Sequence, residues 1–490
     1  MKHIFIFFLV LSVFFSSNAQ NKPFVGEQNR LVVFVRFNGD PEIDTPRSYY
    51  EEMFNGETNS FKSYFQAVSN NKLTINTLFF PQNTDINSSV ELKYCYYCYD
   101  NTWKGNYPDC KGSDIASLFE LNIGFMLQEL AEKLELTGNV PSGVALDSNN
   151  DDYIDNFVIV FRGAGRGMGK GIHSPQVGTV SQDFIDTKGE IRLKGKQIRD
   201  YIITYERNSL ETHCRFLLSR LGFPVQYRNS RALPRSAGAW DPMDGPLLSY
   251  PLTYNRMKYT NNNWISEIPR IIEPGTYSLS SADNAANNAY KIQSSDSQQF
   301  WMLEYRNNTV AWETNLPESG LLIYRVNSNY IGSVTANPEV YLYRKDGNNT
   351  NSGNVADAPF SNINGRTTFN ATSNPAAFLS DGTISNDINI SNISFSGNKV
   401  SFTVNELPSS VTTAQDESEW QIRYNSNLKK LHVYGEGVEE VILFGISGQF
   451  IKSVSGQTTG SIDTADLPYG VYIAQLKGKS TTKSLKIVLN

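Results

Sequence analysis

The spacing of the apolar residues changes near Pro274, and this change limits the fold more than any other feature. Before Pro274, apolar runs that are typical of buried strands, such as 31–37 and 157–161, alternate with patterns of helical spacing. After it, short alternating runs are separated by Asn, Ser, Gly and Thr. The chain has 490 residues, so we expect several domains, an α+β part first and β-rich parts after it.

Two helices stand out in the first part. One is expected over 113–138, and the other runs from Ser209 to Leu221 and stops at Gly222. The second helix has an apolar stripe at spacings of three and four, formed by Leu210, Cys214, Leu217, Leu218 and Leu221. Cys214 is therefore expected to be a buried, small apolar residue.

The first 19 residues have the three regions of a secretory signal peptide. Lys2 supplies a positive start, 4–15 is an apolar run, and 17–19 offers small residues before a cut at Gln20. A membrane anchor is the alternative, but the run is shorter than the roughly 20 apolar residues that a spanning helix needs. We therefore expect a secreted chain without a transmembrane segment.

Charge and cysteine content narrow the functional classes. The net charge of −6 argues against a nucleic-acid partner, because such proteins present basic surfaces. Cys95, Cys98 and Cys110 lie close together, with no fourth ligand evident nearby. A local disulfide is favoured over a zinc site in an exported chain, and the pairing among the three stays open.

The C-terminal residues are expected to form a small, separate β-domain. A polar linker over 408–419 precedes it, and the domain itself covers 420–490. Five short strands are expected there, at 428–434, 440–444, 449–454, 471–476 and 484–489.

Three segments of this domain, 441–449, 467–473 and 483–489, together resemble the immunoglobulin-like C-terminal sorting domain of type IX secretion cargo. The resemblance covers about residues 415–490. It implies passage across the outer membrane, the type IX secretion machinery as partner, and removal of the domain. An adhesion or carbohydrate-binding module is the alternative, since Gly-x-Tyr turns occur in many β-sandwiches.

A second resemblance rests on seven segments of the remaining chain: 60–65, 69–73, 147–157, 221–224, 240–244, 300–306 and 319–326. In this order they resemble segments of the secreted zinc metalloproteases typified by immune inhibitor A, and the resemblance covers most of residues 25–405. It implies a zincin-like α+β domain over 20–273 and a β-sandwich over 274–407.

The family holds zinc with H-E-x-x-H, because two histidines four residues apart share a helix face and the glutamate activates the bound water. Leu221-Gly222 sets the register for this chain. The resemblance then implies that the four zinc-site positions are occupied by Arg215, Phe216, Ser219 and Val225. An arginine keeps its proton, and Phe and Val have no donor atom, so we expect no zinc there although the family binds it.

The chain has only four histidines, which limits any rearranged site. His3 lies in the signal peptide and His432 in the sorting domain, so His173 and His213 remain. His173 follows a Gly-rich loop and is interpreted either as lining the cleft or as an ordinary loop residue. A site rebuilt from His173, His213 and Cys214 is chemically conceivable, but no spacing supports it.

The acidic segment 147–155 resembles a calcium loop. Oxygen ligands are offered by Asp147, Asn149, Asp151, Asp155 and the carbonyl of Tyr153. Asp152 stands where a glycine is usual, and Val158 stands where a bidentate glutamate is usual. A solvated acidic turn is the alternative interpretation.

These observations favour a secreted, metalloprotease-like protein that has lost its catalytic centre and keeps a structural role or binds a peptide or protein. The resemblance implies that Met243, in the methionine turn 240–244, forms the floor of the former metal site. Two alternatives remain. One is an active zinc metalloendopeptidase with a rearranged site, and the other is a surface adhesin or glycan-binding protein.

Overall fold

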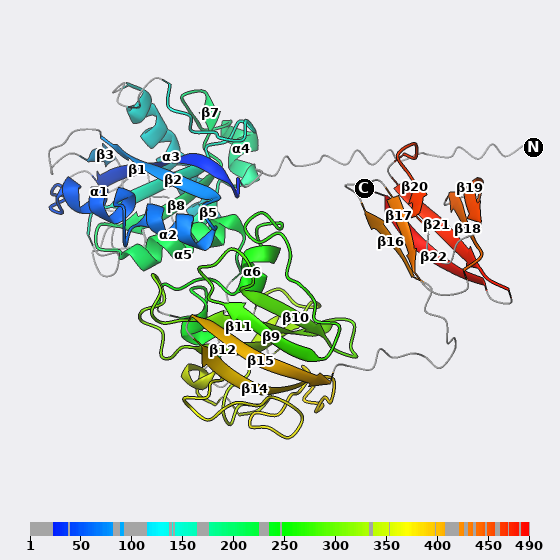
Figure 1. Cartoon of the computed structure of the whole chain (residues 1–490). Helices are drawn as coiled ribbons and strands as arrows, with labels where there is room; N and C mark the ends of the chain where they lie inside the picture. The colour runs from blue at the N-terminus through cyan, green and yellow to red at the C-terminus, as the bar shows by residue number, and fades with distance from the viewer. Residues whose placement is uncertain are drawn as a thin grey trace, which may run out of the picture. The chain divides into compact units, whose positions relative to one another are not determined.

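The structure is a computed structural model of the chain. It describes residues 23–37, 40–81, 89–92, 115–136, 140, 143–163, 176–224, 235–245, 247–332, 337–351, 353–396, 398–406, 421–425, 430–434, 438–445, 448–455, 461–468, 470–479 and 482–489. Two compact units are present, one up to Pro408 and one from Ser409 to Asn490 (Figure 1). The expected signal peptide (1–19), the linker (408–419) and Cys95, Cys98 and Cys110 lie outside the described residues.

The first half of the larger unit is built on a six-stranded sheet with the order β2-β1-β4-β8-β5, in which β3 also pairs with β1. β1 is parallel to β2, β3 and β4, β4 is parallel to β8, and β5 is antiparallel to β8. The elements of this half are β1 (Gly26–Phe37), α1 (Arg47–Asn55), α2 (Phe61–Val68), β2 (Leu73–Phe80), β3 (Val90–Leu92), α3 (Ile115–Leu136), β4 (Asn156–Phe161), β5 (Gln176–Thr179), α4 (Gln182–Lys188), β6 (Arg192–Leu193), β7 (Lys196–Gln197), β8 (Asp200–Tyr205), α5 (Leu210–Leu221), η2 (Gly238–Trp240) and α6 (Thr253–Lys258).

Both faces of β1 are buried over 31–35, which explains the continuous apolar run there. Leu31 and Val33 point into a core shared with α3 and α4. Val32 and Phe34 point to the other face, into a core that we call the α5 cluster; it contains apolar residues of α1, α2 and α5 together with Met243, Tyr250 and Trp264. The first half is therefore a mixed α/β fold, and α5 packs directly on its central sheet.

The second half contains two antiparallel sheets that face each other, β10-β11-β12-β13 and β14-β15-β9. Trp301 and Ile323 lie in the core between them, with Phe402 from the other sheet. The opposite face of the first sheet presents Met302 and Leu322 to a further core, which includes Trp240. The elements are β9 (Gly275–Ser280), β10 (Ala289–Gln293), β11 (Gln299–Arg306), β12 (Gly320–Asn327), β13 (Val340–Leu342), η3 (Val355–Asp357), β14 (Asn389–Ser396) and β15 (Lys399–Glu406).

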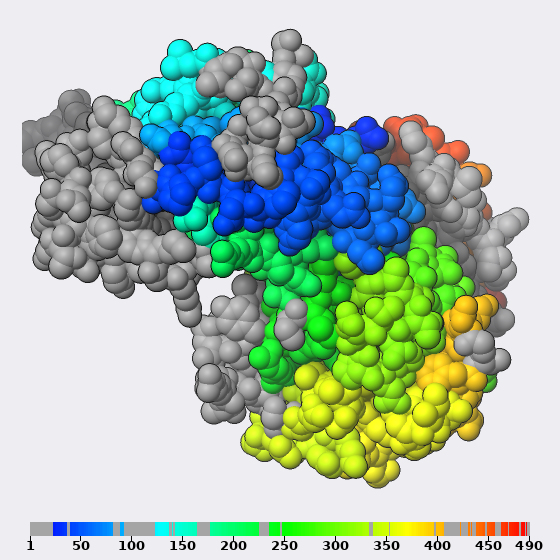
Figure 2. All heavy atoms as spheres, turned by 90° about the vertical axis from the view of Figure 1, so that its left-hand side faces the viewer, coloured from blue at the N-terminus to red at the C-terminus, as the bar shows by residue number. Residues whose placement is uncertain are grey.

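A buried charged network joins the two halves. Arg306 of β11 donates to the backbone oxygens of Trp240 at 2.8 Å and Tyr250 at 2.9 Å, and it pairs with Glu304 and Glu313. All three charged side chains are fully buried. In Figure 2 the residues in green lie between those in blue and those in yellow, within one continuous body. The sequence predicts two domains here, over 20–273 and 274–407. In the structure both ranges lie in the same compact unit.

The smaller unit contains the sheets β16-β17-β20 and β19-β18-β21-β22 around a core that includes Leu431, Leu443 and Leu476. Its described strands are β16 (Gln421–Asn425), β17 (Lys430–Tyr434), β18 (Glu440–Gly445), β19 (Phe450–Ser455), β20 (Ser461–Asp463), β21 (Gly470–Lys477) and β22 (Thr482–Leu489). The prediction of five strands was wrong, because β16 and β20 were missed. β20 has only three residues, too few for a visible alternation.

Candidate functional site

Helix α5 carries three of the four positions that the protease resemblance assigns to zinc. It follows β8 and ends at Gly222, whose backbone has the left-handed φ of 98° and whose N–H donates to the carbonyls of Leu218 and Ser219. The helix and its glycine stop are therefore confirmed. Arg215, Phe216 and Ser219 are all half-buried on this helix, and Val225 lies outside the described residues.

Arg215 and Ser219 are four residues apart and so share one face of α5. The Nε and Nη2 atoms of Arg215 are buried, and they have no hydrogen-bond partner among the described residues. Phe216 packs at the edge of the α5 cluster. A guanidinium has only donors and a phenyl ring has neither donor nor acceptor, so these side chains cannot act as zinc ligand and general base.

The segment 240–244, which the protease resemblance interprets as a methionine turn, is fixed by Asp241, which is fully buried. Its Oδ1 accepts from the N–H of Met243 at 2.8 Å, and its Oδ2 accepts from Leu252 N at 3.0 Å and Asn255 Nδ2 at 2.9 Å. Burial raises the pKa of Asp241 to about 6, against the effect of these hydrogen bonds. Met243 is packed into the α5 cluster, so the structure brings the turn and α5 to a common core.

Tyr64 of α2 lies beside both elements. Its hydroxyl donates to the carbonyl of Ser249 at 2.9 Å. Burial raises the pKa of Tyr64 well above its usual value, Cys214 and Asp241 raise it further, and the charge of Arg215 opposes them. The positive charge of Arg215 therefore acts on the same small region as Tyr64 and Asp241.

His213 and Cys214 are buried on the sheet side of α5. The Nδ1 atom of His213 lies 3.5 Å from Nη2 of Arg30, which projects from β1 and is itself fully buried. Burial, and after it the charge of Arg30, lowers the pKa of His213 well below its usual value. The adjacent guanidinium disfavours a metal cation here. His173 lies outside the described residues.

Arg30 was missed by the sequence reasoning. Its signal is an arginine directly before the apolar run 31–37, at the same parity as Val32. Burial raises the pKa of the Cys214 thiol well above its usual value, although Arg30 opposes the shift. Over the residues that the structure describes, no group of three or more His, Cys, Asp or Glu side chains is arranged to hold a metal ion.

The acidic segment forms a tight turn before β4, and Asn150 and Asp152 have positive φ there. Asp147 accepts from the backbone N–H groups of Asp151 at 3.1 Å and Asp152 at 3.0 Å, and from Lys196 Nζ at 2.7 Å. Burial alone would raise the pKa of Asp147, but these hydrogen bonds hold it below its usual value. The ammonium of Lys196 thus occupies an oxygen that a calcium ion would need.

Other expected calcium ligands are also engaged locally. Asn149 donates to Asp151 at 3.2 Å, and Asp151 accepts from the N–H of Tyr153 at 3.1 Å. Asp155 accepts from the N–H of Ser148 at 2.7 Å through Oδ2, while its Oδ1 is buried without a partner among the described residues. Burial raises the pKa of Asp155. The donor set is one that calcium accepts, but a bound ion requires Lys196 to move away from Asp147.

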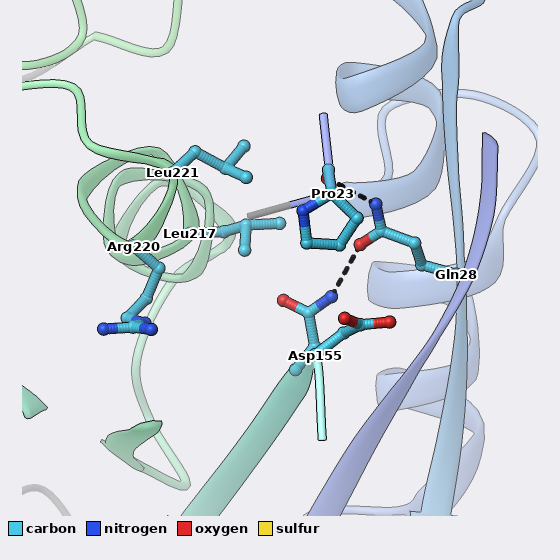
Figure 3. Close-up of a pocket in the computed structure, with 7 residues that line it drawn as sticks. Pro23, Gln28, Asp155, Leu217, Arg220 and Leu221 are labelled. Atoms are coloured by element: carbon cyan, nitrogen blue, oxygen red, sulfur yellow. Dashed lines mark hydrogen bonds between the residues drawn. The ribbon is translucent and has the colours of Figure 1, made fainter. Parts of the chain in front are cut away.

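A small cavity lies between α5 and the first residues of β1 and β4 (Figure 3). Gln28 bridges it by accepting from Asn156 at 2.9 Å and donating to the carbonyl of Pro23 at 2.6 Å. The volume of the cavity is about 10 Å³, which is room for about one water molecule. It is therefore too small for a substrate. The lining residues are Pro23, Gln28, Asp155, Asn156, Leu217, Arg220 and Leu221.

Comparison with known proteins identifies the C-terminal unit. Residues 417–490 match the family described as Secretion system C-terminal sorting domain. No curated protein matches the chain. Among the described helices, none is both long and apolar enough to cross a bilayer. The predicted sorting domain is thus confirmed; it directs secretion through the type IX system to the cell surface or the outside, with that machinery as partner.

Proposed function

We propose that the larger unit is a zincin-like, metalloprotease-related domain that has lost zinc chemistry and binds peptide or protein ligands outside the cell. The observation that carries the proposal is the position of Arg215, Phe216 and Ser219 on α5, a helix that packs on the central sheet and ends at Gly222. Met243 packs into the same core. These positions support the interpretation of α5 as a former metal-binding helix whose ligand side chains are replaced.

The replacements remove each part of the hydrolytic reaction. Peptide-bond hydrolysis by a zinc ion needs several neutral or anionic zinc ligands, an open position for water and a general base. Arg215 contributes a fixed positive charge instead of a ligand, and Phe216 supplies no base. What remains for this face is recognition of a ligand without bond cleavage.

Calcium in the segment 147–155 belongs to the same proposal as a structural ion. Asp147, Asp151 and Asp155 supply the carboxylate oxygens, and the unpartnered Oδ1 of Asp155 offers one free position. Binding requires Lys196 to leave Asp147, so calcium would replace one positive charge by another in this turn.

The test uses the exported protein, purified without chelators. One set of peptides is presented as quenched substrates that report cleavage and as labelled ligands that report binding. The proposal expects binding without cleavage, both with and without added zinc. Cleavage that a chelator abolishes would establish an active metallopeptidase, and binding to a glycan array with no peptide binding would establish an adhesin.

A further inference from the structure

The sheet β19-β18-β21-β22 of the sorting domain has one face in the domain core and one face turned away from it. Leu443 of β18 and Tyr472 of β21 belong to the core, together with residues of β17 and β20. Side chains alternate along a strand, so Phe444 and Ile473, the next residues along the chain, point to the opposite face. Both are outside the core cluster and half-buried. Solvent therefore reaches this second face, which we call the outer face.

The strand register gathers apolar side chains on the outer face. Phe444 is paired with Phe450 of β19 on one side and with Ile473 of β21 on the other. The rings of Phe444 and Phe450 lie 6.4 Å apart, edge to face. Ile442 lies two residues before Phe444 and therefore on the same face. These four residues form what we call the outer-face patch: Ile442, Phe444, Phe450 and Ile473.

Phe450 is the most exposed residue of the patch, with 62% of its surface open to solvent. Over the part of the smaller unit that the structure describes, only Phe450 and Val454 are exposed large apolar residues. Val454 is paired with the core residue Val441, so it lies on the opposite side of β19. An aromatic ring that becomes buried on association contributes strongly to binding. Phe450 is thus placed to anchor a partner on the outer face.

Polar residues border the patch on the same face. Ser453, which is exposed, is paired with Ile442. The next pair on this face, Glu440 and Lys477, forms an ion pair at 3.4 Å whose charges cancel. An apolar centre with a polar rim is typical of a protein interface. The matching partner surface is therefore apolar, with a depression that accepts an aromatic ring.

The family of this domain indicates which partner needs such a surface. A sorting domain works only if the secretion machinery recognises it. A second copy of the chain on the same face would hide the face from that machinery. We propose that a component of the type IX secretion machinery binds the outer-face patch and buries the ring of Phe450 in an apolar depression. The family match identifies the domain, but it assigns this recognition to no surface.

The experiment follows the full chain, with its signal peptide, in cells that have the type IX system. Each variant is produced in excess beside a tagged wild-type copy of the same chain, and both are measured outside the cells. Phe450→Ser removes the ring, and Ser453→Asp places a charge beside Ile442. Val454→Ser is the matched control, because it removes an exposed apolar side chain from the other side of the same strand. Thermal unfolding of each chain, purified from cells that lack the system, shows whether the sorting domain is folded.

The proposal expects excess wild-type chain to reduce export of the tagged copy, because both occupy the same machinery. The Val454→Ser chain should compete equally well. The Phe450→Ser and Ser453→Asp chains should compete about 10-fold less well and should themselves leave the cells less efficiently, since the centre of the interface is lost or charged. Their melting temperatures should stay close to that of the wild-type protein.

Three results would overturn the proposal. One is wild-type competition and export by both Phe450→Ser and Ser453→Asp. Another is an equal loss in Val454→Ser, which would assign recognition to the edge of β19 and not to the outer face. The third is a wild-type dimer in analytical ultracentrifugation that Phe450→Ser dissociates without any effect on export, which would assign the patch to a second copy. If Phe450→Ser unfolds, Ser453→Asp decides, because Ser453 is exposed and its replacement removes no packing.

Discussion

At the scale of single residues, Arg30 is a charge in an apolar core. It stacks on Phe61 at 4.0 Å and Phe54 at 4.9 Å, and its Nε and Nη1 have no partner among the described residues. Burial lowers the pKa of Arg30 to about 9, so it is still charged at neutral pH. Arg30→Met should therefore raise the free energy of unfolding by about 1–3 kcal/mol, as measured by urea denaturation. A decrease would show that the ring contacts outweigh desolvation.

His213 gives a second prediction at this scale. Its pKa in the folded state lies well below the unfolded value of 6.5, so below pH 6.5 the unfolded chain binds a proton that the folded chain does not. Stability from this residue is therefore present above pH 6.5 and is lost as the pH falls, by about 1.4 kcal/mol per pH unit. His213→Asn keeps an acceptor for Arg30 and should remove this part of the acid sensitivity. Equal pH profiles for both proteins would contradict the assignment.

The sequence predicts residue positions better than residue environments. The glycine stop placed Arg215 and Ser219 on one helix face, because helix registers follow from local spacing. The sequence did not predict that Arg30 would contact His213, since that contact joins residues 183 positions apart. It also did not predict that Lys196 would bind Asp147, because the pair depends on a turn between two short strands, β6 and β7.

At the scale of elements, α5 depends on its final turn. Gly222 has φ of 98°, a conformation that costs a residue with a Cβ roughly 1–2 kcal/mol. Gly222→Ala should lower the free energy of unfolding by about 1 kcal/mol, and Gly222→Asn should lower it less, since asparagine tolerates this conformation. Thermal denaturation of the two variants provides the measurement. An equal loss of stability in both variants would mean that side-chain packing, and not the backbone conformation, causes the destabilisation.

The elements that were predicted have strong local signals. Helix α2 begins at Phe61 and is capped by Ser60, a residue type with a strong preference for this position, whose side chain accepts from the N–H of Ser63 at 3.1 Å. β8 and α4 were not predicted. β8 is buried along its whole length, yet it begins with Asp200 and contains Thr204, polar residues that find partners only in the tertiary structure. Tertiary context thus decides where local patterns are weak.

At the scale of the whole molecule, Arg306 holds the two halves of the larger unit together. Removing the arginine leaves Glu304 and Glu313 buried without their cation. Arg306→Met should therefore lower the free energy of unfolding by about 3–5 kcal/mol. Calorimetry should show one cooperative transition for residues 23–406, moved to lower temperature by the substitution. Two separate transitions for the two halves, with only one of them moved, would contradict this description.

The chain is exported by its sorting domain, and we propose that its larger unit is protease-like without zinc chemistry. The most direct test is metal analysis of the protein, purified without chelators, by mass spectrometry. The account predicts substoichiometric zinc, with calcium as the metal retained if the segment 147–155 binds it. Stoichiometric zinc, together with proteolysis that a chelator abolishes, would contradict the account.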